Sequence, residues 1–161
     1  MKIIGLMVFV LLIACPVSAE IEKQYDSSNK SSTIYSSFNS DVNPWDAVKF
    51  LKISQEKVDS GTVIMLFSSE PGLWFFSQND MDIIIDDELY RAKLSRTRIN
   101  METKIHKETQ TASYRIDTSI TEKIIHAKKI AIKVYLTNKP DITWTVPDFV
   151  LNEWKQVLTN S

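Results

Sequence analysis

The sequence predicts a mainly β protein (α+β): an antiparallel β-sandwich or a curved sheet of about eight strands, with one short internal helix and a C-terminal helix packed on the sheet. Two observations favour this fold class. Several segments alternate apolar and polar side chains, as half-buried strands do. These segments also follow one another without repeated strand–helix units, which favours antiparallel pairing.

The first segment of the predicted domain fits two structures. Asn43 and Pro44 would be a favourable start for a helix that ends near Gly61. Val48 and Phe50 fit an alternating pattern better, so we favour a strand here, paired with one that starts at Gly61.

The next segments have clearer patterns. Residues 62–67 are an unbroken apolar run, typical of a central strand that is buried on both faces. A turn at Pro71-Gly72 precedes a second strand over residues 73–76. Residues 82–85 and 89–94 flank three acidic residues and predict a hairpin with an acidic tip.

A change of phase marks the strand that follows this tip. Tyr90, Ala92 and Leu94 face one side, whereas beyond Ser95 the inward positions move to Ile99 and Met101 and then to Ile105. A shift by one residue predicts a β-bulge or a bend at Ser95-Arg96-Thr97.

The C-terminal part predicts two helices around a hairpin. Residues 112–116 fit a half-buried strand, and a capping-box pattern at Ser119 predicts a short helix to Ala127. Residues 130–136 and 142–146 alternate on either side of a turn, and a terminal helix begins at Pro147.

The N-terminus has the three parts of a secretory signal: Lys2, an uncharged run over residues 3–14, and a small-residue cleavage site that ends at Ala19. The sequence therefore predicts an exported protein, with a signal peptide over residues 1–19. We expect a periplasmic or secreted location.

Cys15 allows a second mature form. Leu12-Ile13-Ala14-Cys15 resembles the lipobox of bacterial lipoproteins, in which the cysteine is lipidated and becomes the new N-terminus. The resemblance covers four residues and implies a lipoprotein signal over residues 1–14 and a membrane anchor at Cys15. Pro16 departs from the usual pattern of that family, so both mature N-termini, Cys15 and Glu20, stay open.

We expect residues 20–42 to be a flexible Ser-rich tether and residues 43–161 to be a single β-rich domain. Without the first 19 residues the chain has 142, carries a net charge of −2 and contains no cysteine. It is then one domain without disulfides, which favours a bacterial envelope protein. The charge and the predicted export exclude nucleic acid as a partner, and no motif predicts a cofactor.

Charged residues form two clusters. Acidic side chains between residues 80 and 88 are weak candidates for a metal site, because the spacing does not fit a calcium loop. Basic side chains downstream would form a stripe on one sheet face if their strands are neighbours. Such a stripe would suit anionic lipid headgroups, lipid-bound phosphates or an acidic protein. The acidic candidates are Asp80, Asp82, Asp86, Asp87 and Glu88, and the basic ones are Arg91, Lys93, Arg96, Arg98 and Lys104.

An aromatic run after the Pro-Gly turn is a further binding candidate. Trp74, Phe75 and Phe76 cannot all face one side of a strand, so we expect core packing for most of them or, as an alternative, an exposed patch.

The hypothesis that follows is a non-catalytic envelope domain that binds a protein, lipid or glycan. One alternative is a small hydrolase or metal-dependent enzyme that uses these acids with His106 or His126, which requires a histidine in contact with two carboxylates. Another is a structural subunit with an unpaired sheet edge.

Overall fold

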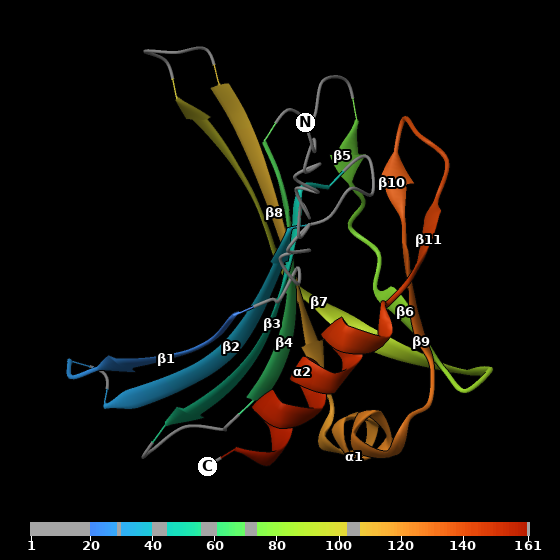
Figure 1. Ribbon diagram of the computed structural model, residues 1–161. Coiled ribbons are helices and arrows are strands. Elements are labelled where there is room, and N and C mark those ends of the chain that lie inside the picture. The colour runs from blue at the N-terminus through green and yellow to red at the C-terminus, as the bar shows by residue number, and fades with distance from the viewer. Residues whose placement is uncertain are drawn as a thin grey trace, which may run out of the picture.

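Figure 1 shows the computed structural model, which describes residues 20–28, 30–39, 45–55, 61–69, 74–102 and 107–160. Cys15, Lys104 and His106 lie outside these ranges, and so do residues 1–19. The described strands are β1 (Glu20–Asp26), β2 (Ser31–Asn39), β3 (Ala47–Gln55), β4 (Gly61–Ser68), β5 (Phe75–Phe76), β6 (Met81–Ile85), β7 (Glu88–Glu102), β8 (Lys107–Ile116), β9 (Ile130–Val134), β10 (Leu136–Thr137) and β11 (Ile142–Thr145). The described helices are α1 (Thr118–His126) and α2 (Asp148–Thr159).

Nine of these strands form one antiparallel sheet, in the order β1-β2-β3-β4-β8-β7-β6-β9-β11. β5 and β10 form a second, two-stranded sheet. The large sheet is strongly curved, and both helices lie on one side of it (Figure 1). The structure therefore confirms the predicted mainly β fold with a C-terminal helix, in the form of a curved sheet.

The core lies between the helices and the face that they cover, called here the inner face. Along β4, Thr62, Ile64 and Leu66 are buried and alternate with half-buried residues of the opposite, outer face. From α2, Trp154 stacks on Phe50 of β3 with ring centroids 4.6 Å apart. The inward-facing residues, every second one along each strand, thus pack against the apolar face of each helix.

Several local predictions are confirmed. The segment after residue 46 is a strand, β3, paired with β4 from Gly61 onward. The hairpins β6–β7 and β9–β11 are present, and the first turns through Asp86 and Asp87, which both have positive φ. The register between β7 and β8 shifts between Leu94 and Arg96, so the predicted bulge is at Ser95.

The predicted tether is wrong for the part that the structure describes. Most of residues 20–39 form β1 and β2, and β2 pairs with the whole length of β3. Ile34 is buried and Ile21 and Phe38 pack against the core, so three apolar residues of this segment meet the hydrophobic core of the domain. The buried Ser36 hydroxyl donates a hydrogen bond to Glu153 of α2 at 2.8 Å.

Two smaller predictions also need correction. Of the strand expected over residues 73–76, Phe75 and Phe76 form the short β5, Trp74 precedes it, and Leu73 lies outside the described residues. The capping box at Ser119 does not form, because α1 begins at Thr118 and its N-cap is Asp117, with no side-chain capping bond. The Thr121 hydroxyl instead donates to the carbonyl oxygen of Thr118 at 2.7 Å.

Candidate functional site

The candidate site is a row of basic side chains on the outer face of the sheet. Ala92 and Leu94 of β7 face inward, so Arg91 and Lys93 face outward. In an uninterrupted strand, Arg96 and Arg98 would have the opposite parity and face inward. The extra residue at Ser95 restores the phase, and all four basic side chains are exposed on the outer face.

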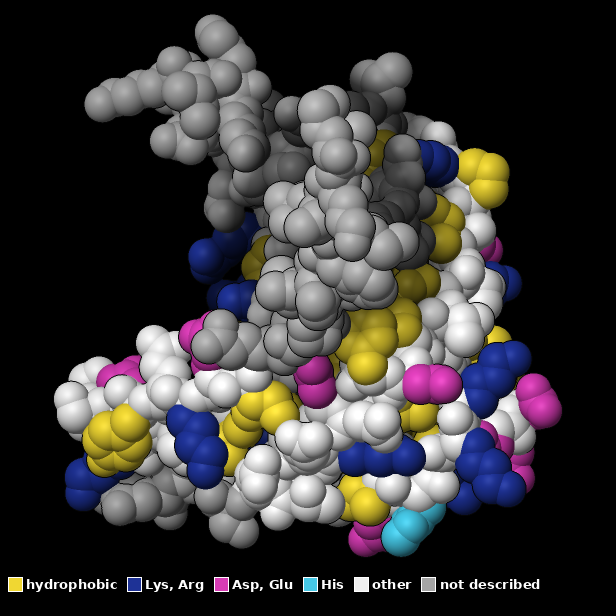
Figure 2. Space-filling model, in the orientation of Figure 1, with side chains coloured by type: hydrophobic (Ala, Val, Ile, Leu, Met, Phe, Trp, Pro, Cys, Tyr) yellow, Lys and Arg dark blue, Asp and Glu magenta, His cyan; other side chains and the backbone are white. Residues whose placement is uncertain are grey.

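The neighbouring strand adds one more cation to this row. Arg115 of β8 is paired with Lys93, and on the same face Arg96 and Arg98 are paired with Ser113 and Thr111. We call the set Arg91, Lys93, Arg96, Arg98 and Arg115 the basic stripe. Figure 2 shows dark blue Lys and Arg side chains on the flank of the sheet that lies opposite the helices.

Among the described residues, one carboxylate pairs with the stripe on β7. Arg91 Nε lies 3.3 Å from Oδ1 of Asp82, which is only 6% exposed. The Tyr135 hydroxyl donates to Oδ2 of Asp82 at 2.6 Å, and this hydrogen bond raises the pKa of the Tyr135 phenol. Within the described part of the chain, no acidic group lies within ion-pair distance of Lys93, Arg96 or Arg98.

Apolar side chains accompany the stripe on the outer face. Leu89 has the same parity as Arg91 and is 61% exposed. On the other side of β8, the outer residues of β4 are the half-buried Val63, Met65 and Phe67. Lys49 of β3 places its Nζ 5.8 Å from the ring centroid of Phe67. The outer face thus combines positive charge with accessible apolar surface.

The aromatic candidates are mainly core. Trp74 and Phe76 are buried and contact each other edge to face, with centroids 5.3 Å apart. Gln110 holds this segment: its Nε2 donates to the Trp74 carbonyl at 2.8 Å, and its Oε1 accepts from the Phe76 amide at 3.2 Å. Phe75 is half-buried. An exposed aromatic patch therefore does not form at Trp74 and Phe76.

The acidic candidates bind protein groups and do not converge. Asp80 accepts a hydrogen bond from the Leu94 amide at 2.9 Å, which caps the open side of β7 beside the bulge. Asp86 accepts from two backbone amides of the α1–β9 loop, and Glu88 accepts from the Tyr90 hydroxyl. In the described ranges, no three metal-ligating side chains come together, so Asp87 is not part of such a group either.

His126 lies at a cavity but does not form the contacts that an acid–base or metal site requires. The cavity, of about 580 Å³, is lined by Asp86, Glu88, Glu122 and Lys123 in addition to His126. Among the described residues none is hydrogen-bonded to the His126 ring, which is exposed (Figure 2, cyan). Lys123 is placed over the Tyr90 ring, and its hydrogen bond to Tyr90 raises the Lys123 pKa.

Comparison of the chain with protein families, curated proteins and solved structures found no match. Neither described helix is long and apolar enough to span a bilayer.

Sequence reasoning found four members of the stripe and missed the fifth. Arg91, Lys93, Arg96 and Arg98 lie on one strand, where the phase change is visible in the pattern. Arg115 joins them through the pairing of β7 with β8, and its local sequence has no signal for that register.

Proposed function

We propose that this protein is an exported, non-catalytic binding domain of the bacterial cell envelope, and that its outer face binds the anionic lipid headgroups of a membrane. The observation that carries the proposal is the alignment of Lys93, Arg96 and Arg98 with Arg115 on one face across the bulge. The described part of the chain contains no cysteine. A protein exported to the periplasm would encounter the anionic headgroups of a membrane there, with or without a lipid anchor at Cys15.

The shape of the stripe suits a surface better than a small ligand. Residues 91 to 98 span about 20 Å along β7 at the usual rise of a strand. Their side chains are exposed and emerge from a sheet face, so several of them can contact separate headgroups at once. Leu89 at one end and Val63 and Met65 beside β8 would contact the interfacial region of the bilayer.

The charge alone provides a measurable affinity. Each Lys or Arg near an anionic membrane contributes about 1 kcal/mol, and Asp82 offsets the charge of Arg91. Lys93, Arg96 and Arg98, which have no acidic partner among the described residues, then contribute about 3 kcal/mol, or roughly a hundredfold or more in partitioning. Because this attraction decays over a Debye length of about 10 Å at 0.1 M salt, it should weaken strongly at about 1 M salt.

Vesicle co-sedimentation tests this directly. Every protein is the full chain carrying Cys15→Ser, which removes the lipid attachment that the lipobox would direct. Binding to vesicles with phosphatidylglycerol is expected, with little binding to pure phosphatidylcholine vesicles. Arg96→Gln/Arg98→Gln should weaken binding by about 30-fold, since it removes two cations worth about 1 kcal/mol each.

Lys128→Gln/Lys129→Gln is the matched control. It removes the same charge from the α1–β9 loop, where both side chains are exposed. It should change the affinity by less than about threefold. Leu89→Gln should weaken binding by about tenfold, because part of the exposed leucine would no longer be buried on binding. Equal losses from the two double variants, or equal binding to neutral vesicles, would show that the stripe is not the membrane-binding surface.

A further inference from the structure

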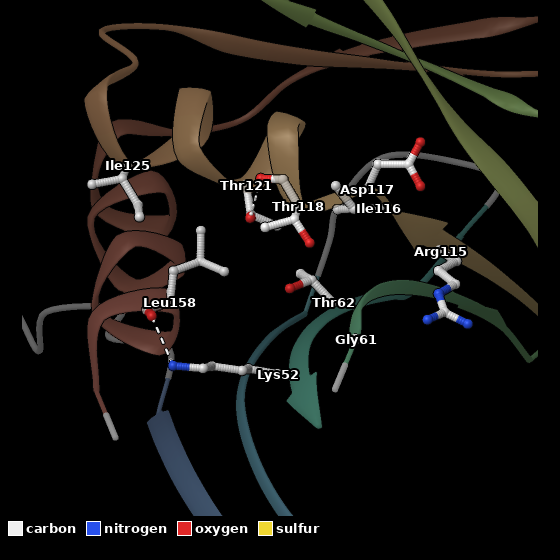
Figure 3. A pocket seen from close by; sticks show the side chains of 10 residues that line it. All are labelled: Lys52, Gly61, Thr62, Arg115, Ile116, Asp117, Thr118, Thr121, Ile125 and Leu158. Carbon is white, nitrogen blue, oxygen red and sulfur yellow. Dashed lines mark hydrogen bonds between the residues drawn. The ribbon is translucent and has the colours of Figure 1, made fainter. Parts of the chain in front are cut away.

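A cavity of about 240 Å³ lies where α1 and α2 meet the ends of three strands. Figure 3 shows its lining: Thr62 at the start of β4, Thr118 and Thr121 of α1, Leu158 of α2, and Lys52 of β3. Arg115 and Gly61 form the side of the cavity toward the outer face. Polar and apolar groups thus surround a space large enough for a small ligand.

The Thr62 hydroxyl is an unusual group in this cavity. The residue is only 7% exposed, and in Figure 3 its oxygen points into the space between Lys52 and Thr118. The Thr62 hydroxyl forms no hydrogen bond with any of the described residues. The hydroxyl faces the cavity, where it is available for a hydrogen bond to a polar ligand.

The N-terminus of α1 opens onto the same cavity. Its first amides with partners in the helix are those of Ile120 and Thr121, which both donate to the Asp117 carbonyl, at 2.9 and 3.1 Å. The preceding amides of Thr118 and Ser119 point outward at the positive end of the helix dipole, and no side chain caps them. Such a helix end favours an anion.

The charges at the rim have the matching sign. Lys52 Nζ lies at the cavity, where it donates to the carbonyl oxygens of Leu158 and Asn160 at 2.9 Å each. The guanidinium of Arg115 lies over Gly61, where an added methyl group would be 3.7 Å from Nε. Asp117 is also at the rim, but its carboxylate is exposed and points away from the Thr62 hydroxyl in Figure 3.

We propose that this cavity binds a phosphate group. The Thr62 and Thr118 hydroxyls and the first amides of α1 would donate hydrogen bonds to its oxygens, and Lys52 and Arg115 would supply positive charge. The group would come either from a soluble phosphate or from a lipid headgroup. The site shares Arg115 with the basic stripe, but its other residues are distinct from the exposed β7 members of the stripe, so it does not depend on the membrane binding proposed above.

Titration followed by amide NMR shifts tests the proposal on the full chain with Cys15→Ser. Inorganic phosphate and dihexanoyl phosphatidylglycerol below its micelle concentration are the two probes, each added at constant ionic strength. Saturable shifts of the Thr118 and Ser119 amides are expected with at least one probe, and the tighter probe identifies the source. Thr62→Val, which keeps the shape of the side chain, should weaken that binding by about tenfold or more, because it removes a hydrogen bond to a charged group.

Two variants separate this site from other effects. Thr143→Val makes the same change at an exposed position of β11 and should leave binding unaltered. Arg96→Gln/Arg98→Gln should also bind the probe normally, even if it no longer binds vesicles. Thr118→Val changes an exposed residue and should also weaken binding, so it replaces Thr62→Val in the test if that variant is unstable. Shifts that never saturate, or equal affinity in the Thr62, Thr118 and Thr143 variants, would overturn the proposal.

Discussion

Asp86, in the turn of the β6–β7 hairpin, connects this turn to the α1–β9 loop, which is far away in the sequence. Its replacement tests whether the carboxylate stabilises the fold through these contacts. Its carboxylate accepts hydrogen bonds from the Lys128 amide at 2.9 Å and the Lys129 amide at 2.8 Å. Its own amide donates to the Lys129 carbonyl at 3.0 Å. The residue has a φ of 47°, in the left-handed region. Three substitutions separate these features: Asp86→Asn, Asp86→Gly and Asp86→Ala.

The expected losses of stability follow from the contacts. A hydrogen bond to a charged acceptor contributes about 1.5 kcal/mol or more, so the loss of two costs about 3 kcal/mol. A left-handed alanine costs about 1 kcal/mol more, which glycine avoids. We therefore expect losses of about 4 kcal/mol for alanine and about 3 for glycine. Asparagine keeps one acceptor oxygen and tolerates this backbone, so it should lose only about 1 kcal/mol.

Urea unfolding followed by the fluorescence of the four tryptophans measures these differences. Asp87→Ala is the matched control, because Asp87 has a φ of 71° and its carboxylate has no partner among the described residues. It should lose only the backbone part, about 1 kcal/mol. The reasoning fails if Asp86→Ala is no less stable than Asp87→Ala, or if Asp86→Gly is less stable than Asp86→Ala.

Four further outcomes are expected. Trp154→Ala, at a side chain that is 1% exposed, should lower the free energy of unfolding by about 3–5 kcal/mol in the same urea assay. Burial raises the pKa of the Tyr114 phenol far above its usual range, with a smaller contribution from Asp80, so the unfolded chain releases this proton first. The contribution of Tyr114 to stability should be constant below about pH 10 and fall above it, and Tyr114→Phe should reduce the slope of stability against pH there by up to about 1.4 kcal/mol per pH unit. Deletion of Ser95 removes the extra residue but leaves Arg96 opposite Ser113, so vesicle affinity should stay within about threefold of the starting protein. The intact mass of the protein from the membrane fraction should match either a lipidated chain that begins at Cys15 or an unmodified chain that begins at Glu20, and any other N-terminus would contradict the predicted signal.

The strand segments were predictable wherever one face is apolar along the whole strand. The alternation in β9 and β11 fixes which side chains face the core, and the turn between them fixes their pairing. The bulge was predictable for the same reason, because a change of parity within a single strand is visible without knowing its partner. These are local signals, and the structure confirms them.

The N-terminal strands could not be predicted from local signals. β1 and β2 contain many serines, and by themselves they lack enough apolar surface to become ordered. Their order comes from the pairing of β1 with β2 and of β2 with β3, and from contacts of β2 with α2 at the other end of the chain. The bond between Ser36 and Glu153 joins residues 117 positions apart. A composition-based prediction does not include such contacts.

The two clusters of charge behaved differently for one physical reason. Carboxylates accept hydrogen bonds from backbone amides, so acidic residues near turns are readily used within the fold, as Asp80 and Asp86 are. Arginine and lysine only donate, and in the middle of a sheet the backbone acceptors are already engaged by neighbouring strands. Among the described residues, the outward-facing Lys93, Arg96 and Arg98 of β7 accordingly have no acidic partner. For this reason the proposed membrane binding rests on the basic stripe and not on the acidic tip.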